Sequence, residues 1–142
     1  MRISIISFLV LPILFVSCFG GADPFDKTYY EKATKATFPA KYKVLETFDN
    51  GEFLTGAVLE LDSLALRHFI VQNHLDTLRD RLGLGLIQWG VPYFKTERPE
   101  FKNNELLFSV SKSVGKMNWT YIAEPEKDKL WAVINYPDWS GQ

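Results

Sequence analysis

Residues 105–136 have the sequence ELLFSVSKSVGKMNWTYIAEPEKDKLWAVINY, the clearest structural pattern in the chain. Apolar and polar side chains alternate here, and β-branched and aromatic residues are frequent. Such alternation places every second side chain on one face of a strand. Short turns at 113–116 and 124–129 separate three alternating segments: Glu105–Lys112, Met117–Ala123 and Leu130–Tyr136. The pattern predicts an antiparallel meander.

Two further strands are predicted upstream, over Lys41–Phe48 and Glu52–Leu61. Asp49-Asn50-Gly51 lies between them, and Asn-Gly can supply the two positive-φ positions of a type I′ turn. In the second segment, the side that contains Ala57 and Leu59 is the more consistently apolar. The two segments therefore predict a β-hairpin.

A helix is predicted to begin after Asp62, whose side chain can cap the first turn. Leu66, Phe69 and Ile70 follow at helical spacing and form a face that can pack on a sheet. A second apolar set points the other way: Leu64, Val71, Leu75, Leu78 and Leu82. Either the helix is buried on two sides, or it breaks near Asn73-His74 and restarts from Asp76 to Gly83; we favour the break. The order ββαβββ predicts a small α+β domain with an antiparallel sheet and a helix packed on one face, with the strand order left open.

The start of the chain has the regions of a secretory signal. Met1-Arg2 carries one positive charge, and Ile3–Val16 is apolar except for two serines. This run is too short to span a bilayer comfortably. Phe15-Val16-Ser17-Cys18 closes the segment with a small residue before the only cysteine in the chain.

These four residues resemble the lipobox of bacterial lipoproteins. The resemblance implies cleavage after Ser17, thioether lipidation of Cys18 and acylation of the new amino terminus. Phe19 follows the cysteine, and the absence of Asp there favours the outer over the inner membrane. The alternatives are a signal peptide cleaved after Ala22, which would give a secreted soluble protein, and an uncleaved anchor.

The expected organisation is a signal peptide at 1–17, a lipidated cysteine with tether and lead-in at 18–39, and one domain at 40–142. A short helix is predicted over Tyr29–Thr37. Without Arg2, the 16 basic residues become 15 against 17 acidic ones, a formal charge of −2. This balance predicts no nucleic-acid partner.

No residue set indicates catalysis, a metal site or a cofactor. His68 and His74 are six residues apart and would diverge on a helix, whereas a shared metal site needs i,i+4 spacing. Lipid would block Cys18 as a nucleophile. Glu97, Glu100 and Glu105 alternate with basic residues, which is typical of a solvated surface. We expect a protein that is not an enzyme.

Aromatic residues are the remaining candidates for function. We expect a binding surface among Trp89, Tyr93, Phe94, Trp131 and Trp139, because tryptophan and tyrosine are enriched at binding hot spots. Burial of Trp131 beneath the lead-in is the competing structural role. The sequence thus predicts a lipid-anchored envelope module that binds another protein or macromolecule. The alternative is a small-ligand pocket between helix and sheet, lined by Tyr121 and His68.

Overall fold

The meander predicted from residues 105–136 is present. In the computed structural model, β4 (Phe108–Val114), β5 (Met117–Glu124) and β6 (Lys129–Asn135) pair antiparallel in that order. The structure describes residues 25–79, 84–85, 87–102 and 104–135, with the side chain of Trp89 left out. Gly115 has a φ of +61° at the first position of the two-residue β4–β5 turn, where glycine avoids a steric penalty.

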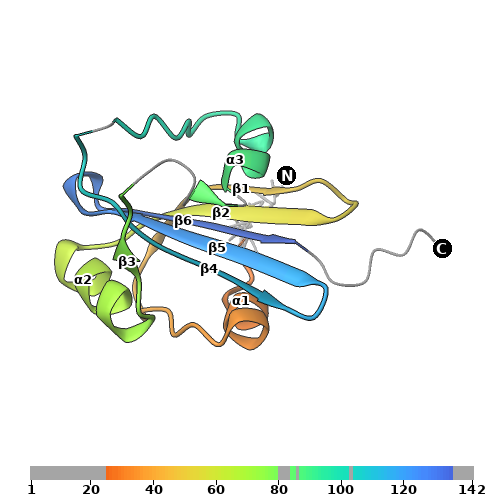
Figure 1. The fold of residues 1–142 in the computed structure, drawn as a ribbon, viewed down its shortest axis with the longest axis horizontal. Coiled ribbons are helices and arrows are strands. Elements are labelled where there is room, and N and C mark those ends of the chain that lie inside the picture. Colours follow the sequence, from red (N-terminus) through yellow and green to blue (C-terminus); the bar gives the residue numbers. More distant parts are fainter. Residues whose placement is uncertain (1–24, 80–83, 86, 103, 136–142) are drawn as a thin grey trace, which may run out of the picture.

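The strands form one six-stranded sheet (Figure 1). The predicted hairpin of β1 (Lys43–Asp49) and β2 (Leu54–Glu60) lies at one edge, and the short β3 (Asp76–Thr77) pairs with β4 at the other. The strand order is β1-β2-β6-β5-β4-β3, so the last strand of the chain lies between β2 and β5. All pairs are antiparallel, which confirms the predicted α+β class.

Both faces of the sheet are covered (Figure 1). Helices α1 (Lys27–Thr34) and α2 (Ser63–Gln72) lie on one face, and α3 (Ile87–Gly90) with the 3-10 turn η2 (Val91–Tyr93) lies on the other. A second 3-10 turn, η3 (Pro125–Lys127), joins β5 to β6. Tyr121 and Ala132 belong to the hydrophobic core on the face covered by α1 and α2, which we call the first core. Ile122 and Trp131 belong to the core on the face covered by α3, which we call the second core. Successive side chains of β5 and β6 are therefore buried in the two cores in turn, one on each face of the sheet.

Helix α2 forms as predicted, since Asp62 accepts a hydrogen bond from the Ala65 backbone N–H at 2.9 Å. Leu66, Phe69 and Ile70 are its buried residues. Asn73 ends the helix, and its side-chain amide donates to the Phe69 carbonyl. The predicted break is therefore present.

The prediction that a helix restarts at Asp76 is wrong. Asp76 pairs with Ser109 as part of β3, and the Leu78 N–H donates to the Leu107 carbonyl. Pairing with the edge of β4 satisfies these backbone groups in place of helical hydrogen bonds. The rest of the expected helix, residues 80–83, lies outside the described residues.

The turn between β1 and β2 also differs from the prediction. A type I′ turn needs positive φ at both central positions, but only Gly51 has one, at +71°. Asn50 uses its side chain instead: its Oδ1 accepts hydrogen bonds from the backbone N–H groups of Glu52, Phe53 and Leu54 at 3.1, 3.0 and 2.9 Å. Asn50 therefore caps a longer loop over residues 50–53.

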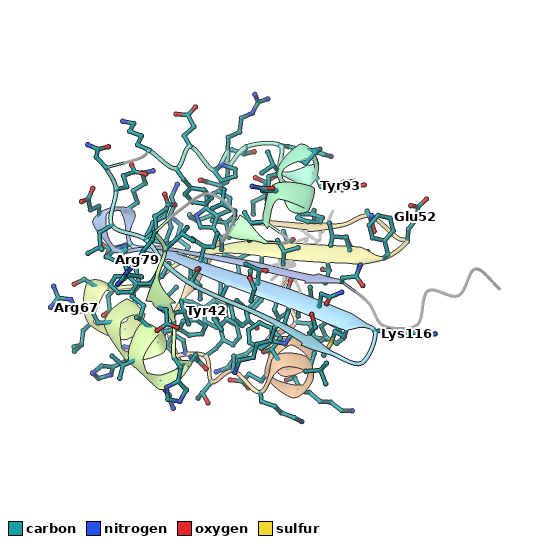
Figure 2. The ribbon with its side chains drawn as sticks, viewed as in Figure 1. Tyr42, Glu52, Arg67, Arg79, Tyr93 and Lys116 are labelled. Atoms are coloured by element: carbon teal, nitrogen blue, oxygen red, sulfur yellow. The ribbon has the colours of Figure 1, made fainter. Side chains whose placement is uncertain are left out.

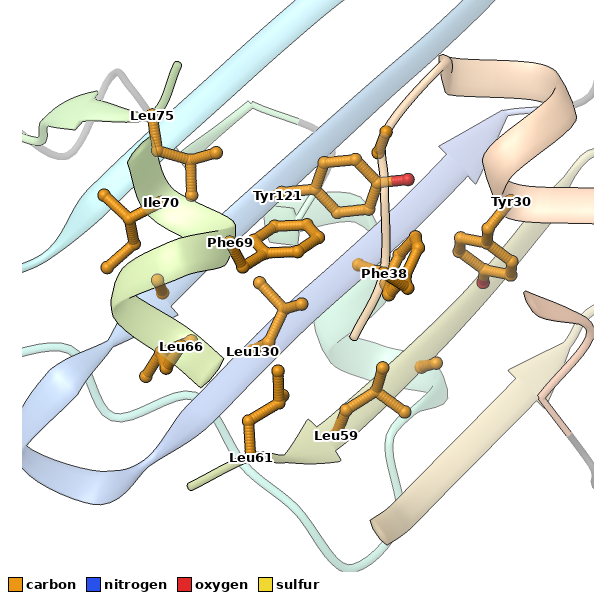
Figure 3. Close-up of a cluster of buried hydrophobic side chains, with 14 of the residues drawn as sticks. Tyr30, Phe38, Leu59, Leu61, Leu66, Phe69, Ile70, Leu75, Tyr121 and Leu130 are labelled. Carbon is orange, nitrogen blue, oxygen red and sulfur yellow. The ribbon is translucent and has the colours of Figure 1, made fainter. Parts of the chain in front are cut away.

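The segment before residue 40 is part of the core rather than a lead-in to it. Phe25, Tyr30 and Phe38 are 2–4% exposed and pack in the first core. Figure 3 shows Phe38 between Tyr30 and the Phe69–Tyr121 pair. The short helix begins at Lys27, two residues earlier than expected. The described part of the domain therefore begins by Phe25.

Candidate functional site

Two of the aromatic residues expected at a binding surface are buried. Phe94 is 4% exposed and Trp131 is 1% exposed, with their rings 5.3 Å apart in an edge-to-face contact. The expectation that they form an exposed surface is therefore wrong. The described residues between 84 and 102, which we call the connection, lie between β3 and β4 and pack on the second face of the sheet. Phe94 and Phe101 of this connection, and not the lead-in, contact Trp131.

Tyr93 is the described aromatic residue of that set with substantial exposure, at 37%. Figure 2 labels Tyr93. Its ring stacks on Phe48 of β1, with 5.3 Å between the ring centres. The side chain of Trp89, together with Trp139 and Cys18, lies outside the described residues. Of the three members of the expected set whose side chains the structure describes, Tyr93 alone is partly exposed.

The alternative site between helix and sheet is not formed by its expected residues. Tyr121 is fully buried and its hydroxyl lies 2.8 Å from Thr34 Oγ1, and burial raises the pKa of this phenol. The rings of Phe38 and Phe69 fill the space beside it. His68 is exposed on the outer side of α2, so the structure does not bring it to Tyr121.

Carboxylates attach the connection to the sheet. Glu97 pairs with Lys129 of β6 at 2.5 Å, and Glu105 pairs with Lys127 at 3.2 Å. Lys127 also pairs at 2.8 Å with Glu124, which is 3% exposed. These groups hold neighbouring segments together. Among the described residues, no group of three or more His, Cys, Asp or Glu side chains is placed to hold a metal ion.

Glu46 fastens the connection to the edge strand β1. Its carboxylate accepts hydrogen bonds from the backbone N–H groups of Lys95, Thr96 and Glu97 at 2.5, 3.0 and 2.6 Å. Burial acts to raise the pKa of Glu46, but the three donors together outweigh it and lower the pKa below 4.5. The ionised form is therefore the one that holds the connection.

Replacing Glu46 by Gln will make unfolding less dependent on pH. A lowered pKa stabilises the fold above the unfolded value of 4.5, and this contribution is lost as the pH falls through the folded pKa. Urea unfolding at pH 7 should show Glu46→Gln less stable by about 1 kcal/mol. The difference should shrink as the pH is lowered from 7 to values below 4.5. A difference that does not change with pH, or an equal effect from the exposed Glu52→Gln, would contradict this role.

The outer side of α2 carries the most exposed apolar residues of the described structure. Leu64 is 63% exposed and Val71 is 74% exposed, and both lie on the side opposite the core-facing residues. A groove of about 280 Å³ runs between this helix and residues 37–39. His68 and Leu64 line it, and Figure 2 shows Arg67 pointing outward from the same helix. This surface is the candidate site.

The sequence contained the signal for this surface. The sequence pattern places Leu64 and Val71 in a second apolar set, and it predicts that Leu75 and Leu78 share their face. The break after α2 separates them, because Leu75 is buried in the first core and Leu78 packs on the second. Only Leu64 and Val71 of the described members remain exposed.

Comparisons with models of known protein families, with curated proteins and with solved structures found no match. Within the described residues, none of the helices is both long enough and apolar enough to span a bilayer. The site must therefore be interpreted from its own chemistry.

Proposed function

We propose that this chain is a lipid-anchored module of the bacterial envelope that binds another protein through the outer side of α2. The observation that carries the proposal is the exposure of Leu64 and Val71 on one helix face. An exposed apolar stripe on a helix is a common recognition surface, read through residues at i, i+4 and i+7. Exposure also costs hydrophobic free energy that a partner would recover, about 1.5–3 kcal/mol for each fully buried side chain.

The charges beside this stripe indicate the chemistry of the partner. Within α2, the cation Arg67 and the imidazole of His68 flank the two apolar residues, and the helix contains no Asp or Glu. Asp62, which precedes the helix, lines the groove and is engaged in capping it. A partner with an apolar centre and carboxylates at its rim would complement this surface. We therefore expect the partner to present an acidic protein surface.

The lipid anchor supplies the location. Cys18 lies seven residues before Phe25, a reach of at most about 25 Å for an extended chain. Two or three acyl chains on Cys18 would make membrane attachment stable, whereas one chain would hold the protein only reversibly. The domain would thus remain close to the bilayer, with the outer membrane favoured, and its partner would be another envelope protein.

One experiment tests both parts of the proposal. A photo-crosslinking amino acid replaces Leu64 or Val71 in the full chain. The control carries the same amino acid in place of Glu52, which lies at the tip of the β1–β2 hairpin, far from α2 (Figure 2). After irradiation of intact cells, positions 64 and 71 should capture the same protein and position 52 should not. The amino-terminal peptide from the same membranes should carry the mass of an acylated Cys18.

The double variant Leu64→Asp/Val71→Asp should then weaken binding of the identified partner at least tenfold, roughly 1.4 kcal/mol or more. Its thermal stability should be unchanged, since both side chains are exposed. Equal capture from all three positions would remove α2 as the contact. An unmodified peptide that begins at Asp23 would show a secreted soluble protein instead.

A further inference from the structure

We propose that the β1–β2 loop promotes conversion of the Asn50 side-chain amide to a carboxylate, without an enzyme, through a cyclic imide formed with the Gly51 nitrogen. Glycine has no side chain, so its nitrogen can approach the preceding asparagine side chain closely. The loop also surrounds the amide with groups that suit each step of this reaction. It lies on elements other than α2, so this modification site is separate from the protein-binding surface proposed above.

Three donors polarise the side-chain carbonyl of Asn50. Its Oδ1 accepts hydrogen bonds from the backbone N–H groups of Glu52, Phe53 and Leu54 at 3.1, 3.0 and 2.9 Å. When a nucleophile adds to Cγ, negative charge develops on this oxygen, and fixed backbone donors stabilise such charge as they do in an oxyanion hole. The donors are already in place, so the loop activates the carbon at which the imide ring closes.

The nitrogen of the same amide has no bond that must be broken before it leaves. Asn50 Nδ2 is buried and has no hydrogen-bond partner among the described residues. A buried polar atom without a partner is destabilising, and loss of this nitrogen as ammonia removes that cost. The oxygen that replaces it can share the three backbone donors, because a carboxylate accepts hydrogen bonds at both of its oxygens. The loop therefore suits the product better than the amide.

The attacking nitrogen, that of Gly51, lies beside a carboxylate. The Gly51 N–H donates to Asp49 Oδ1 at 2.8 Å, so Asp49 is placed to take the proton as the nitrogen attacks. Water is also at hand, because Gly51 and Glu52 are exposed. Figure 2 shows Glu52 at the tip of the hairpin, on the outside of the molecule.

These groups and one water molecule balance the reaction. A bond forms between the Gly51 nitrogen and Asn50 Cγ, and the amide proton passes to Asp49. The Cγ–Nδ2 bond then breaks, and the nitrogen takes the proton from Asp49 and leaves as ammonia. Water adds to Cγ and breaks its bond to the Gly51 nitrogen, which leaves aspartate at position 50 and changes the formal charge of the chain from −1 to −2. Water at the main-chain carbonyl would give isoaspartate instead.

The test follows the tryptic peptide 44–67 by mass spectrometry. Asn50 carries the only side-chain amide in this peptide, so the mass change from amide to carboxyl reports this site alone. The full chain is incubated at neutral pH in nonionic detergent, and the same chain unfolded in guanidinium chloride is the reference. Conversion should be about tenfold faster or more in the folded chain. Aspartate should exceed isoaspartate there, since the three donors direct water to Cγ.

The decisive variant is Asp49→Ser. Serine can still accept the Gly51 N–H but is a far weaker base, so the fold is retained while conversion slows by about fivefold or more. Glu52→Ala removes a neighbouring charge, keeps the backbone donor at that position and should change the rate less than twofold. Circular dichroism checks the fold of both variants. A folded chain that converts no faster than the unfolded one, a rate unchanged by Asp49→Ser, or equal slowing by Glu52→Ala would overturn the proposal.

Discussion

Replacing Trp131 by Ala will lower the free energy of unfolding by about 3–5 kcal/mol, as measured by urea denaturation. Trp131 is 1% exposed and lies at the centre of the second core. Phe94 and Phe101 pack edge-on against its indole ring at 5.3 and 5.8 Å. The substitution removes the ring against which Phe94 and Phe101 pack, and the surrounding structure can collapse only partly into the cavity.

A hydrogen bond adds to the packing of this ring. Trp131 Nε1 donates to Glu124 Oε2 at 2.5 Å, and Glu124 is almost fully buried. Trp131→Phe keeps most of the packing but leaves that oxygen without its donor, at a cost of about 1–3 kcal/mol. Trp119→Phe is the matched control, since within the described structure its buried Nε1 has no hydrogen-bond partner.

The two Trp→Phe variants should therefore differ, with Trp131→Phe the more destabilised. The double variant Trp131→Phe/Glu124→Gln should recover part of the loss, because a neutral amide is less costly to bury unpaired than a carboxylate. Equal losses at Trp131 and Trp119 would show that the hydrogen bond contributes little. The second core would then be held by packing alone.

A chain that begins at residue 40 will show no cooperative unfolding transition, whereas one that begins at Asp23 will unfold cooperatively. The shorter chain lacks the buried rings of Phe25, Tyr30 and Phe38. Burial of one large apolar side chain contributes about 1.5–3 kcal/mol, so three rings approach the 5–15 kcal/mol stability of a whole domain. Near-ultraviolet circular dichroism and urea titration of both chains measure the difference.

A point substitution separates the effect of lost packing on stability from the effect of removing residues 23–39. Phe38 lies 5.1 Å from Phe69 and 5.7 Å from Tyr121, ring centre to ring centre. Phe38→Ala in the longer chain should cost about 3–5 kcal/mol. Thr37→Ala, at the exposed neighbouring position, should remain within about 0.5 kcal/mol of the parent. Cooperative unfolding of the chain from residue 40 would show that the sheet and α2 suffice.

Several elements could be predicted because their signals are local. Alternation in 105–136 reports the two faces of each strand, and these faces match the two cores of the structure. Asp62 and the spacing of Leu66, Phe69 and Ile70 are contained within a few residues, and α2 formed as expected. The prediction of a type I′ turn at Asn50-Gly51 is wrong, because Asn-Gly fits more than one kind of turn and the side-chain hydrogen bonds of Asn50 leave no periodic pattern in the sequence.

The candidate surfaces could be predicted only in part. Leu64 and Val71 were visible as an apolar set, but their exposure depends on the break after Gln72 and on where Leu75 then packs. Phe94 and Trp131 looked equally suitable as contacts, yet the connection buries both.

By itself, the sequence determined the class of the domain, the core-facing side chains of its strands and the start of α2. These follow from periodicity and capping, which act over a few residues. The tertiary structure decided that β6 lies between β2 and β5, and that the connection forms a second layer. It also decided that residues from Phe25 onward complete the first core. Local patterns specify which side chains share a face, but contacts between distant segments determine what covers that face.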